Sequence, residues 1–298
     1  VIEAASGKSW HAWLDEALLA PNGLTRTVYG ANDALIAGMA SGYTVHDGRV
    51  APAAFLSMTQ PHAAGALVST VDELHRWNRA LHGGKLLSAK SYTAMTTPAG
   101  KAKDANYGFG IAGGTLRNRP IQQHGGGIFG YASYLMYLPE AELSVVVLQN
   151  ADATVGGPTD TAVLAKLVGA FALGDPYPEA RPIEVSAETL KSAEGVYRID
   201  EQATRVLRVV DGKLTAQRTG SERLPLIPTA PDAFHYEGTL TWFKLERDAE
   251  GKITGMRLYQ DGEGEGVVAT LTGDPLPSAR ASIEGPVEQL QRLVGSYS

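Results

Sequence analysis

The sequence predicts an α+β fold in which helices pack against an antiparallel sheet, followed by a small all-β domain. Three observations lead to this prediction. Residues 119–148 read as three short strands joined by tight turns. Residues 159–173 carry apolar side chains at helical spacing. Beyond residue 182 the chain is a series of short strand-like runs, and its 298 residues are enough for two domains.

The centre of the predicted sheet is a β-hairpin. Residues 131–138 alternate in polarity, a turn follows at Pro139 and Glu140, and residues 143–148 are an apolar run. Residues 119–123 form a further strand before this hairpin. Because alternation places one set of side chains on one face, we expect all three to be adjacent antiparallel strands with one buried face.

A histidine and three glycines come where the first of these strands is expected to end. His124 is followed by Gly125, Gly126 and Gly127. Glycine has no Cβ, so its backbone N–H stays open to a substrate carbonyl. An imidazole beside such N–H groups is the layout of an oxyanion site. The alternative is a glycine turn with one surface histidine.

A helix and a stiff linker follow the sheet. The helical run at residues 159–173 is expected to pack on the sheet; its apolar residues are Val163, Leu164, Leu167, Val168 and Phe171. Three prolines then lie between residues 176 and 182, and each fixes φ and removes a hydrogen-bond donor. These features predict a first domain at residues 1–175, a linker at 176–189 and a second domain at 190–275.

Residues 190–275 predict a small barrel or sandwich. Turn signals lie at Asp211-Gly212 and Glu250-Gly251, and the predicted strands are residues 195–199, 206–210, 214–218, 233–236, 241–246 and 253–260. Residues 290–297 echo residues 190–197, each leading into a Gly-x-Tyr sequence. Residues 276–298 are therefore either a tail whose final strand closes the barrel or the start of a second β-domain.

Composition excludes several classes of function. A net charge of −6 without clustered Lys or Arg argues against nucleic acid as a partner. No apolar run approaches the roughly 18 residues that span a bilayer. The chain has no cysteine, so disulfides and thiol catalysis are excluded. Its histidines lack the spacing of a helical metal site, and we expect no metal and no cofactor.

The chain resembles the serine β-lactamase-like family, which includes class C β-lactamases, D-alanyl-D-alanine carboxypeptidases, esterases and D-aminopeptidases. The matching motifs, in family order, are Ser-Gly-Lys at 6–8, residues 63–77, Gly-Gly-Lys-Leu-Leu-Ser at 83–88, Tyr-Gly-Phe-Gly at 107–110 and His-Gly-Gly at 124–126. The resemblance implies that residues 1–175 are the C-terminal part of an α/β sandwich of the β-lactamase and penicillin-binding-protein type. Residues 190–275 resemble the lipocalin-like β-domain of some members, for which a ligand carrier, a packing domain or an oligomer contact are the alternatives.

The resemblance also implies roles for individual residues. In the family a serine attacks an amide, lactam or ester carbonyl and forms an acyl-enzyme. Gly127 N–H, with the nucleophile's own N–H, would then hold the oxyanion, and His124 would replace the usual lysine. Gly126, between these two residues, would belong to the same catalytic segment. Tyr107, Gly125, Phe129 and Asn150 would border the substrate. The alternatives are a packing role for Tyr107 and a turn-capping role for Asn150.

The family's nucleophile motif is absent from these 298 residues. No lysine follows a serine at the Ser-x-x-Lys spacing, and no tyrosine begins a Tyr-x-Asn triplet. In the family both precede the segment at 6–8, and residues 1–5 read as the end of a helix. We therefore expect a fragment that is inactive alone, with a short peptide or small molecule as substrate. Its expected partners are an upstream segment of the same protein and a homo-oligomer, and the resemblance favours a periplasmic or secreted location. The alternatives are a degenerate protein that has lost its nucleophile and a non-catalytic protein that binds peptidoglycan or D-amino-acid peptides.

Overall fold

The computed structural model describes residues 1–46, 48–152 and 160–278. All but the first three residues of the expected tail or second β-domain at 276–298 therefore lie outside the described residues. The chain forms two compact units. The first comprises residues 1–181 together with 235–242 and 259–266. The second comprises residues 182–234, 243–258 and 267–278. Among the described residues, no helix is both long and apolar enough to cross a membrane.

The first unit is built on a four-stranded antiparallel sheet. Its order is β5-β6-β7-β8, with β5 at Ala112–Leu116, β6 at Arg119–Ile128, β7 at Tyr131–Leu138 and β8 at Leu143–Gln149. The predicted antiparallel neighbours are confirmed by the pairing of β6 with β7 and of β7 with β8. The expected strand end before the glycines was wrong. Strand β6 continues through all three glycines, and the turn comes at Gly130, whose φ of 81° suits a residue without Cβ.

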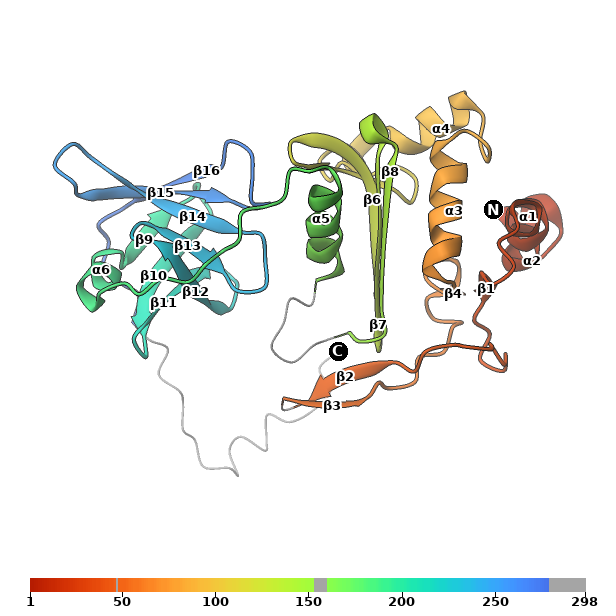
Figure 1. Ribbon diagram of the computed structural model, residues 1–298, viewed down its shortest axis with the longest axis horizontal. Coiled ribbons are helices and arrows are strands. Elements are labelled where there is room, and N and C mark those ends of the chain that lie inside the picture. The colour runs from red at the N-terminus through yellow and green to blue at the C-terminus, as the bar shows by residue number, and fades with distance from the viewer. Residues whose placement is uncertain (47, 153–159, 279–298) are drawn as a thin grey trace. The chain divides into compact units, whose positions relative to one another are not determined.

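Two helices cover the sheet. Figure 1 shows α3 (Val71–His82) along one face and α5 (Thr161–Ala172) along the other. Each begins at a side-chain cap, since Thr70 accepts from the Glu73 N–H and Asp160 accepts from the Ala162 N–H. The period-two pattern of β7 follows from this layering: Tyr134, Met136 and Leu138 join the buried cluster shared with α5.

Helix α5 packs on the sheet through its small residues, not through the large apolar ones expected from the sequence. Ala165 and Ala170 are fully buried, whereas Val168 is 54% exposed and Phe171 is 76% exposed. Gly169 explains the difference, because a Cβ there would lie 2.7 Å from Met136 Cε and 2.9 Å from a Leu116 methyl. The small face lets the helix approach closely, and the large side chains turn outward.

The remaining elements of the first unit are short. Residues 10–19 form an α-helical turn (α2, Trp10–Leu14) continued by a π-helical turn (η1, Asp15–Leu19). The others are α1 (Ile2–Ser6), η2 (Ala20–Asn22), β1 (Val28–Tyr29) paired with β4 (Leu67–Val68), β2 (Tyr43–His46) paired with β3 (Arg49–Pro52), η3 (His62–Ala64), α4 (Ala89–Thr96), η4 (Gly100–Lys103) and η5 (Pro139–Ala141).

A buried carboxylate ties the start of α3 to a distant loop. Glu73 is 1% exposed, and its two oxygens accept the Arg26 N–H at 2.9 and 3.0 Å and the Thr27 hydroxyl at 2.7 Å. Burial alone would raise the pKa of this carboxyl, but the hydrogen bonds from Thr27 and Arg26 and the charge of Arg76 outweigh it and hold the pKa below its ordinary value. Glu73 is therefore a charged group satisfied inside the fold.

A second polar cluster joins the other end of α3 to the sheet and to α4. The half-buried His82 ring stacks on Tyr137 with centroids 4.2 Å apart, and its Nδ1 lies 2.7 Å from the Tyr92 hydroxyl. Burial lowers the pKa of His82 to about 4, because the charged ring loses its hydration there. Nearby, the buried Asn78 donates to Met136 O and to Ser144 Oγ.

The second fold element is a closed eight-stranded antiparallel barrel. Helix α6 (Ala187–Ser192) precedes it, and its strands are β9 (Gly195–Arg198), β10 (Thr204–Val210), β11 (Lys213–Arg218), β12 (Arg223–Ala230), β13 (Ala233–Tyr236), β14 (Trp242–Arg247), β15 (Ile253–Tyr259) and β16 (Val267–Leu271). Of the two predicted alternatives, a barrel or a sandwich, the structure shows the barrel. Fully buried side chains fill its inside, among them Tyr197, Leu207, Phe234, Phe243 and Met256.

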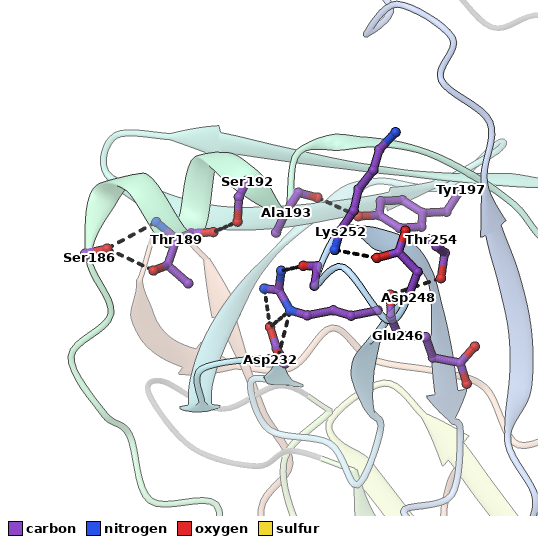
Figure 2. A network of polar contacts seen from close by, with 12 residues as sticks. Ser186, Thr189, Ser192, Ala193, Tyr197, Asp232, Glu246, Asp248, Lys252 and Thr254 are labelled. Atoms are coloured by element: carbon purple, nitrogen blue, oxygen red, sulfur yellow. Dashed lines mark hydrogen bonds and ion pairs between the residues drawn. The ribbon is translucent and has the colours of Figure 1, made fainter.

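Polar contacts hold the turns of this barrel. Figure 2 shows the carboxylate of Asp232 facing a guanidinium, which belongs to Arg247 and donates to both Asp232 oxygens at 2.6–3.1 Å. The same Arg247 donates to Gly251 O, and the Lys252 N–H donates to Asp248. The Tyr197 hydroxyl donates to Ala193 O at 2.8 Å. These contacts fix the hairpin between β14 and β15 and the connection from α6 to β9.

Candidate active site

The structure brings together two of the predicted site residues, Tyr107 and His124. The Tyr107 hydroxyl lies 2.8 Å from His124 Nε2, and the two rings meet edge to face with centroids 5.7 Å apart. The other ring nitrogen, His124 Nδ1, lies 2.6 Å from Gly125 O. Tyr107 is 37% exposed, and His124 is exposed as well. The pair is a hydrogen-bonded couple on the surface of the sheet.

Backbone pairing positions both members of this couple. His124 lies on β6, opposite Leu135 of β7. Tyr107 forms an isolated antiparallel bridge with Ala112, the residue that begins β5 and pairs with Gln123. Gly108 follows Tyr107 and leaves no room for a Cβ, which would lie 2.1 Å from Met95 O. The close passage of the chain past α4 thus fixes the segment that carries Tyr107.

The glycine segment of β6 is paired on one side only. The ladder with β5 ends at the pair Ala112 and Gln123, whereas the ladder with β7 continues to Ile128. Within the described strands, residues 124–128 therefore extend past their neighbour and present one backbone edge. The groups along such an edge can hydrogen-bond an extended substrate.

Packing accounts for two of the three glycines but not for the third. A Cβ on Gly126 would lie 2.7 Å from Ser133 Oγ, and one on Gly125 would lie 3.3 Å from the Tyr134 ring. A Cβ on Gly127 would meet nothing within 4 Å, and the φ of Gly127 is not in the left-handed region. Neither close packing nor a left-handed backbone conformation therefore requires glycine at position 127.

This contrast predicts different outcomes for two alanine substitutions. Gly127→Ala is expected to change the free energy of unfolding by no more than about 0.5 kcal/mol, because its methyl group enters open space. Gly126→Ala is the matched control and should cost about 1 kcal/mol, because Ser133 must move. Thermal unfolding of both variants measures the difference. A large loss of stability in Gly127→Ala would mean that glycine is needed there for the fold.

Gly125 joins the couple through its carbonyl, whereas Phe129 and Asn150 make no described contact with it. Phe129 lies in the turn between β6 and β7 and is 54% exposed. The Asn150 side chain donates to Ser41 O at 2.9 Å, and its backbone O accepts the Tyr43 N–H. Asn150 therefore holds the β2 segment beside the end of β8.

An apolar cavity beside the Tyr107 segment was not predicted from the sequence. Its volume is about 290 Å³, and Phe109, Gly110 and Ile111, which follow Tyr107, form part of its wall. The remaining wall comes from Leu18, Trp77, Leu81, Leu86, Leu87 and Met95. Because these residues are scattered over several elements, no single stretch of sequence signals the cavity. Across the part of the chain that the structure describes, His, Asp and Glu do not gather into a metal site.

Comparison with known proteins agrees with this architecture. A D-aminopeptidase of Gluconobacter oxydans (strain 621H) is 24% identical over 185 residues, which are 61% of this chain and 34% of that protein. The octameric penicillin-binding protein homologue from Pyrococcus abyssi shares the fold with a TM-score of 0.52 at 19% identity, over 90% of this chain and 62% of its own. This chain thus spans about a third of the length of the D-aminopeptidase.

The family comparison covers the unit that holds the site. The model of the beta-lactamase family matches residues 1–170, which include helix α3, most of helix α5 and the whole four-stranded sheet. Tyr107, His124 and the three glycines all lie inside the matched region. More than half of the chain is covered by this match, and the chain belongs to the beta-lactamase family.

Proposed function

We propose that this chain forms one wall of the active site of a serine hydrolase that cleaves amide bonds through an acyl-enzyme. The observation that carries the proposal is the Tyr107–His124 couple beside the open glycine edge of β6, inside the region matched by the beta-lactamase family. The name of the D-aminopeptidase relative supports an amide as the bond that is cleaved. Ester and lactam carbonyls react through the same kind of tetrahedral intermediate.

The residues of this wall have distinct roles in the proposed reaction. The Gly127 N–H, together with an N–H next to the nucleophile, stabilises the oxyanion that forms when a serine attacks the carbonyl. His124 and Tyr107 orient the substrate group next to that carbonyl. The nucleophile lies outside these 298 residues in this proposal, because they contain no Ser-x-x-Lys sequence.

The absence of Ser-x-x-Lys also favours a second function. A protein of this fold without a nucleophile would bind D-amino-acid or peptidoglycan peptides along the β6 edge without cleaving them. A homo-oligomer fits either function, and the Pyrococcus abyssi homologue is octameric.

Labelling with a fluorescent penicillin separates the two functions. We expect the natural polypeptide that contains this chain to be acylated on one serine outside residues 1–298 and to hydrolyse D-alanine p-nitroanilide. The isolated 298-residue chain should stay unlabelled. Labelling within the chain would show that the nucleophile has been misplaced, and an unlabelled natural polypeptide that still binds peptide would establish the non-catalytic function.

The His124→Ala variant tests the site itself. In the natural polypeptide it should lower kcat/KM by about 10²-fold, the scale of one positioned polar group in catalysis. His75→Ala is the matched control, because His75 is exposed on α3 and far along the chain from the couple. Equal activity of the two variants would show that His124 has no role in the active site.

A further inference from the structure

We infer that residues 40–43, Ala53 and the Asp152 carboxylate, which we call the turn clamp, hold the turn between β6 and β7 and thereby position the Gly127 N–H. The inference rests on the proposed function, in which this N–H stabilises the oxyanion. It makes Asp152 a positioning residue, because Asp152 acts through the turn and not on the substrate. All of these residues lie in the first unit.

The glycine segment of β6 needs such support, because its own pairing holds it on one side only. Glycine also loses more backbone freedom on ordering than any other residue. Hydrogen-bonded and non-hydrogen-bonded pairs alternate along an antiparallel ladder, and the pair that flanks a two-residue turn is ordinarily hydrogen-bonded. Ile128 and Tyr131 flank this turn, so the N–H of the preceding Gly127 is expected to face away from β7. Its position therefore depends on how firmly the turn is held.

The first part of the turn clamp is a close contact between two glycines. A Cβ on Gly130 would lie 2.5 Å from Ala53 Cβ and 2.8 Å from Gly42 Cα. A Cβ on Gly42 would in turn lie 2.7 Å from the Tyr131 ring. The Ala53 N–H donates to Gly42 O at 3.0 Å, which joins the two segments that meet the turn. In contrast to Gly127, both of these glycines are required by close packing.

Hydrogen bonds fasten the turn to the clamp. The Gly130 N–H donates to Asp152 Oδ2 at 2.8 Å, and the Tyr131 hydroxyl donates to Ala40 O at 2.8 Å. The Asp152 N–H donates to Tyr43 O at 3.1 Å. Asp152 thus binds the turn through its side chain and the start of β2 through its backbone.

The turn clamp is itself anchored to the end of β8. The Tyr43 N–H donates to Asn150 O at 3.0 Å, and the Asn150 side chain donates to Ser41 O at 2.9 Å. Tyr43 also forms an isolated parallel bridge with Ala151. Because β8 packs against both α3 and α5, the turn is held against a rigid layer of the fold. The Gly127 N–H is then in place before a substrate binds, as oxyanion stabilisation requires.

The order of the glycine segment can be measured by ¹⁵N NMR relaxation of the 298-residue chain labelled on glycine, with the Gly127 signal assigned by Gly127→Ala. We expect an order parameter near about 0.85 for the Gly127 N–H, typical of rigid backbone, and a fall below about 0.6 in Asp152→Ala and in Gly42→Ala. Asp152→Asn keeps an oxygen that can accept the Gly130 N–H, so it should stay close to the unchanged chain. A low order parameter in the unchanged chain, or an unaltered one in Asp152→Ala, would overturn the inference.

Gly30→Ala is the matched control for crowding. Its Cβ would lie 3.0 Å from Val68 Cγ2, beside the pair of β1 and β4 and not beside the turn, so the Gly127 order parameter should not change. Asp152 is exposed, so Asp152→Ala should fold even where the clash in Gly42→Ala prevents folding. An equal loss of order in Gly30→Ala and Asp152→Ala would overturn the inference, because it would show a general loosening of the unit.

Turnover of the natural polypeptide separates positioning from substrate binding. Asp152→Ala should lower kcat for D-alanine p-nitroanilide at least about tenfold and change KM less than about threefold, because an oxyanion donor acts in the transition state. Asp152→Asn should recover most of this loss. An unchanged kcat in Asp152→Ala, with a mobile Gly127, would overturn the inference. Because the NMR measurement needs no turnover, a rigid Gly127 in a polypeptide that hydrolyses nothing would count against the proposed function alone.

Discussion

Replacing Glu73 with alanine is expected to destabilise the start of the first unit by about 3 kcal/mol, the scale for a buried charged group whose partners are left unsatisfied. The carboxylate is 1% exposed and accepts hydrogen bonds from Arg26 N–H and from the Thr27 hydroxyl. Without it, these donors are left without that acceptor, and the loop loses its tie to α3. Hydrogen exchange of the Arg26 amide reports the loss locally, and thermal unfolding reports it for the unit.

The neighbouring residue offers a control for this prediction. Asp72 lies in the same helical turn but is exposed, so Asp72→Ala should cost only about 0.5 kcal/mol through the helix dipole. Because the pKa of Glu73 is lowered in the folded state, its contribution is present above the ordinary glutamate pKa and is lost as the pH falls through the folded value. Equal stability of the Glu73→Ala and Asp72→Ala variants would show that the buried carboxylate does not hold the loop.

Acid is expected to destabilise the first unit through His82. Burial lowers the pKa of His82 to about 4 in the folded protein, whereas an unfolded histidine titrates near 6.5. Between these values the unfolded chain binds more protons, so stability is constant above pH 6.5 and falls as the pH drops toward 4. The loss is at most about 3 kcal/mol, at 1.36 kcal/mol per pKa unit, and solvent access to the half-buried ring reduces it.

The measurement is the midpoint of urea unfolding between pH 7.5 and pH 4.5. His82→Phe keeps an aromatic ring against Tyr137 and cannot be protonated, so its stability should depend less on pH than that of the unchanged protein. His75→Ala should retain the full pH dependence, because His75 is exposed on the same helix. A pH dependence that is the same in His82→Phe and the unchanged protein would rule out His82 as its source.

Alternation of side chains was sufficient to predict the strands that form the sheet, but not their lengths. β7 and β8 have a clear apolar pattern and a single turn between them, and both were predicted to within a residue. The extension of β6 was not predicted, because the glycines at 125–127 have no side chains to show a period. Glycine-rich sequence is ordinarily a turn signal, and here the partner strand β7 supplies the hydrogen bonds that keep it extended.

In the barrel, two strands were missed for different reasons. β12 contains Pro225 and Pro228, which argue against a strand because each lacks an N–H, yet the barrel accommodates both. β16 is only five residues long and follows a glycine-rich turn at 262–266. Sequence patterns alone do not show that a short strand will be needed to close a sheet, since closure depends on partners far along the chain.

The sequence suggested individual candidate residues for the site but not their arrangement. Tyr107 and His124 were each candidates, yet their hydrogen bond depends on the bridge between Tyr107 and Ala112 and on the pairing of Ala112 with Gln123. Strand register across a sheet cannot be read from one sequence. The outward face of α5 was mispredicted for a similar reason, because the closeness of helix and sheet at Gly169 is a property of their packing.

The closure of the barrel has a consequence for how it folds. Its first and last strands are hydrogen-bonded neighbours, with Arg198 opposite Thr270 and Tyr197 opposite Leu271. That contact joins residues about 70 positions apart, so the entropy of closing a long loop must be overcome before the ladder between β9 and β16 can form. Neighbouring hairpins such as β10 and β11 close over a few residues and form early by comparison. The barrel should therefore fold slowly and in an all-or-none manner, with the β9–β16 seam as the last part to form.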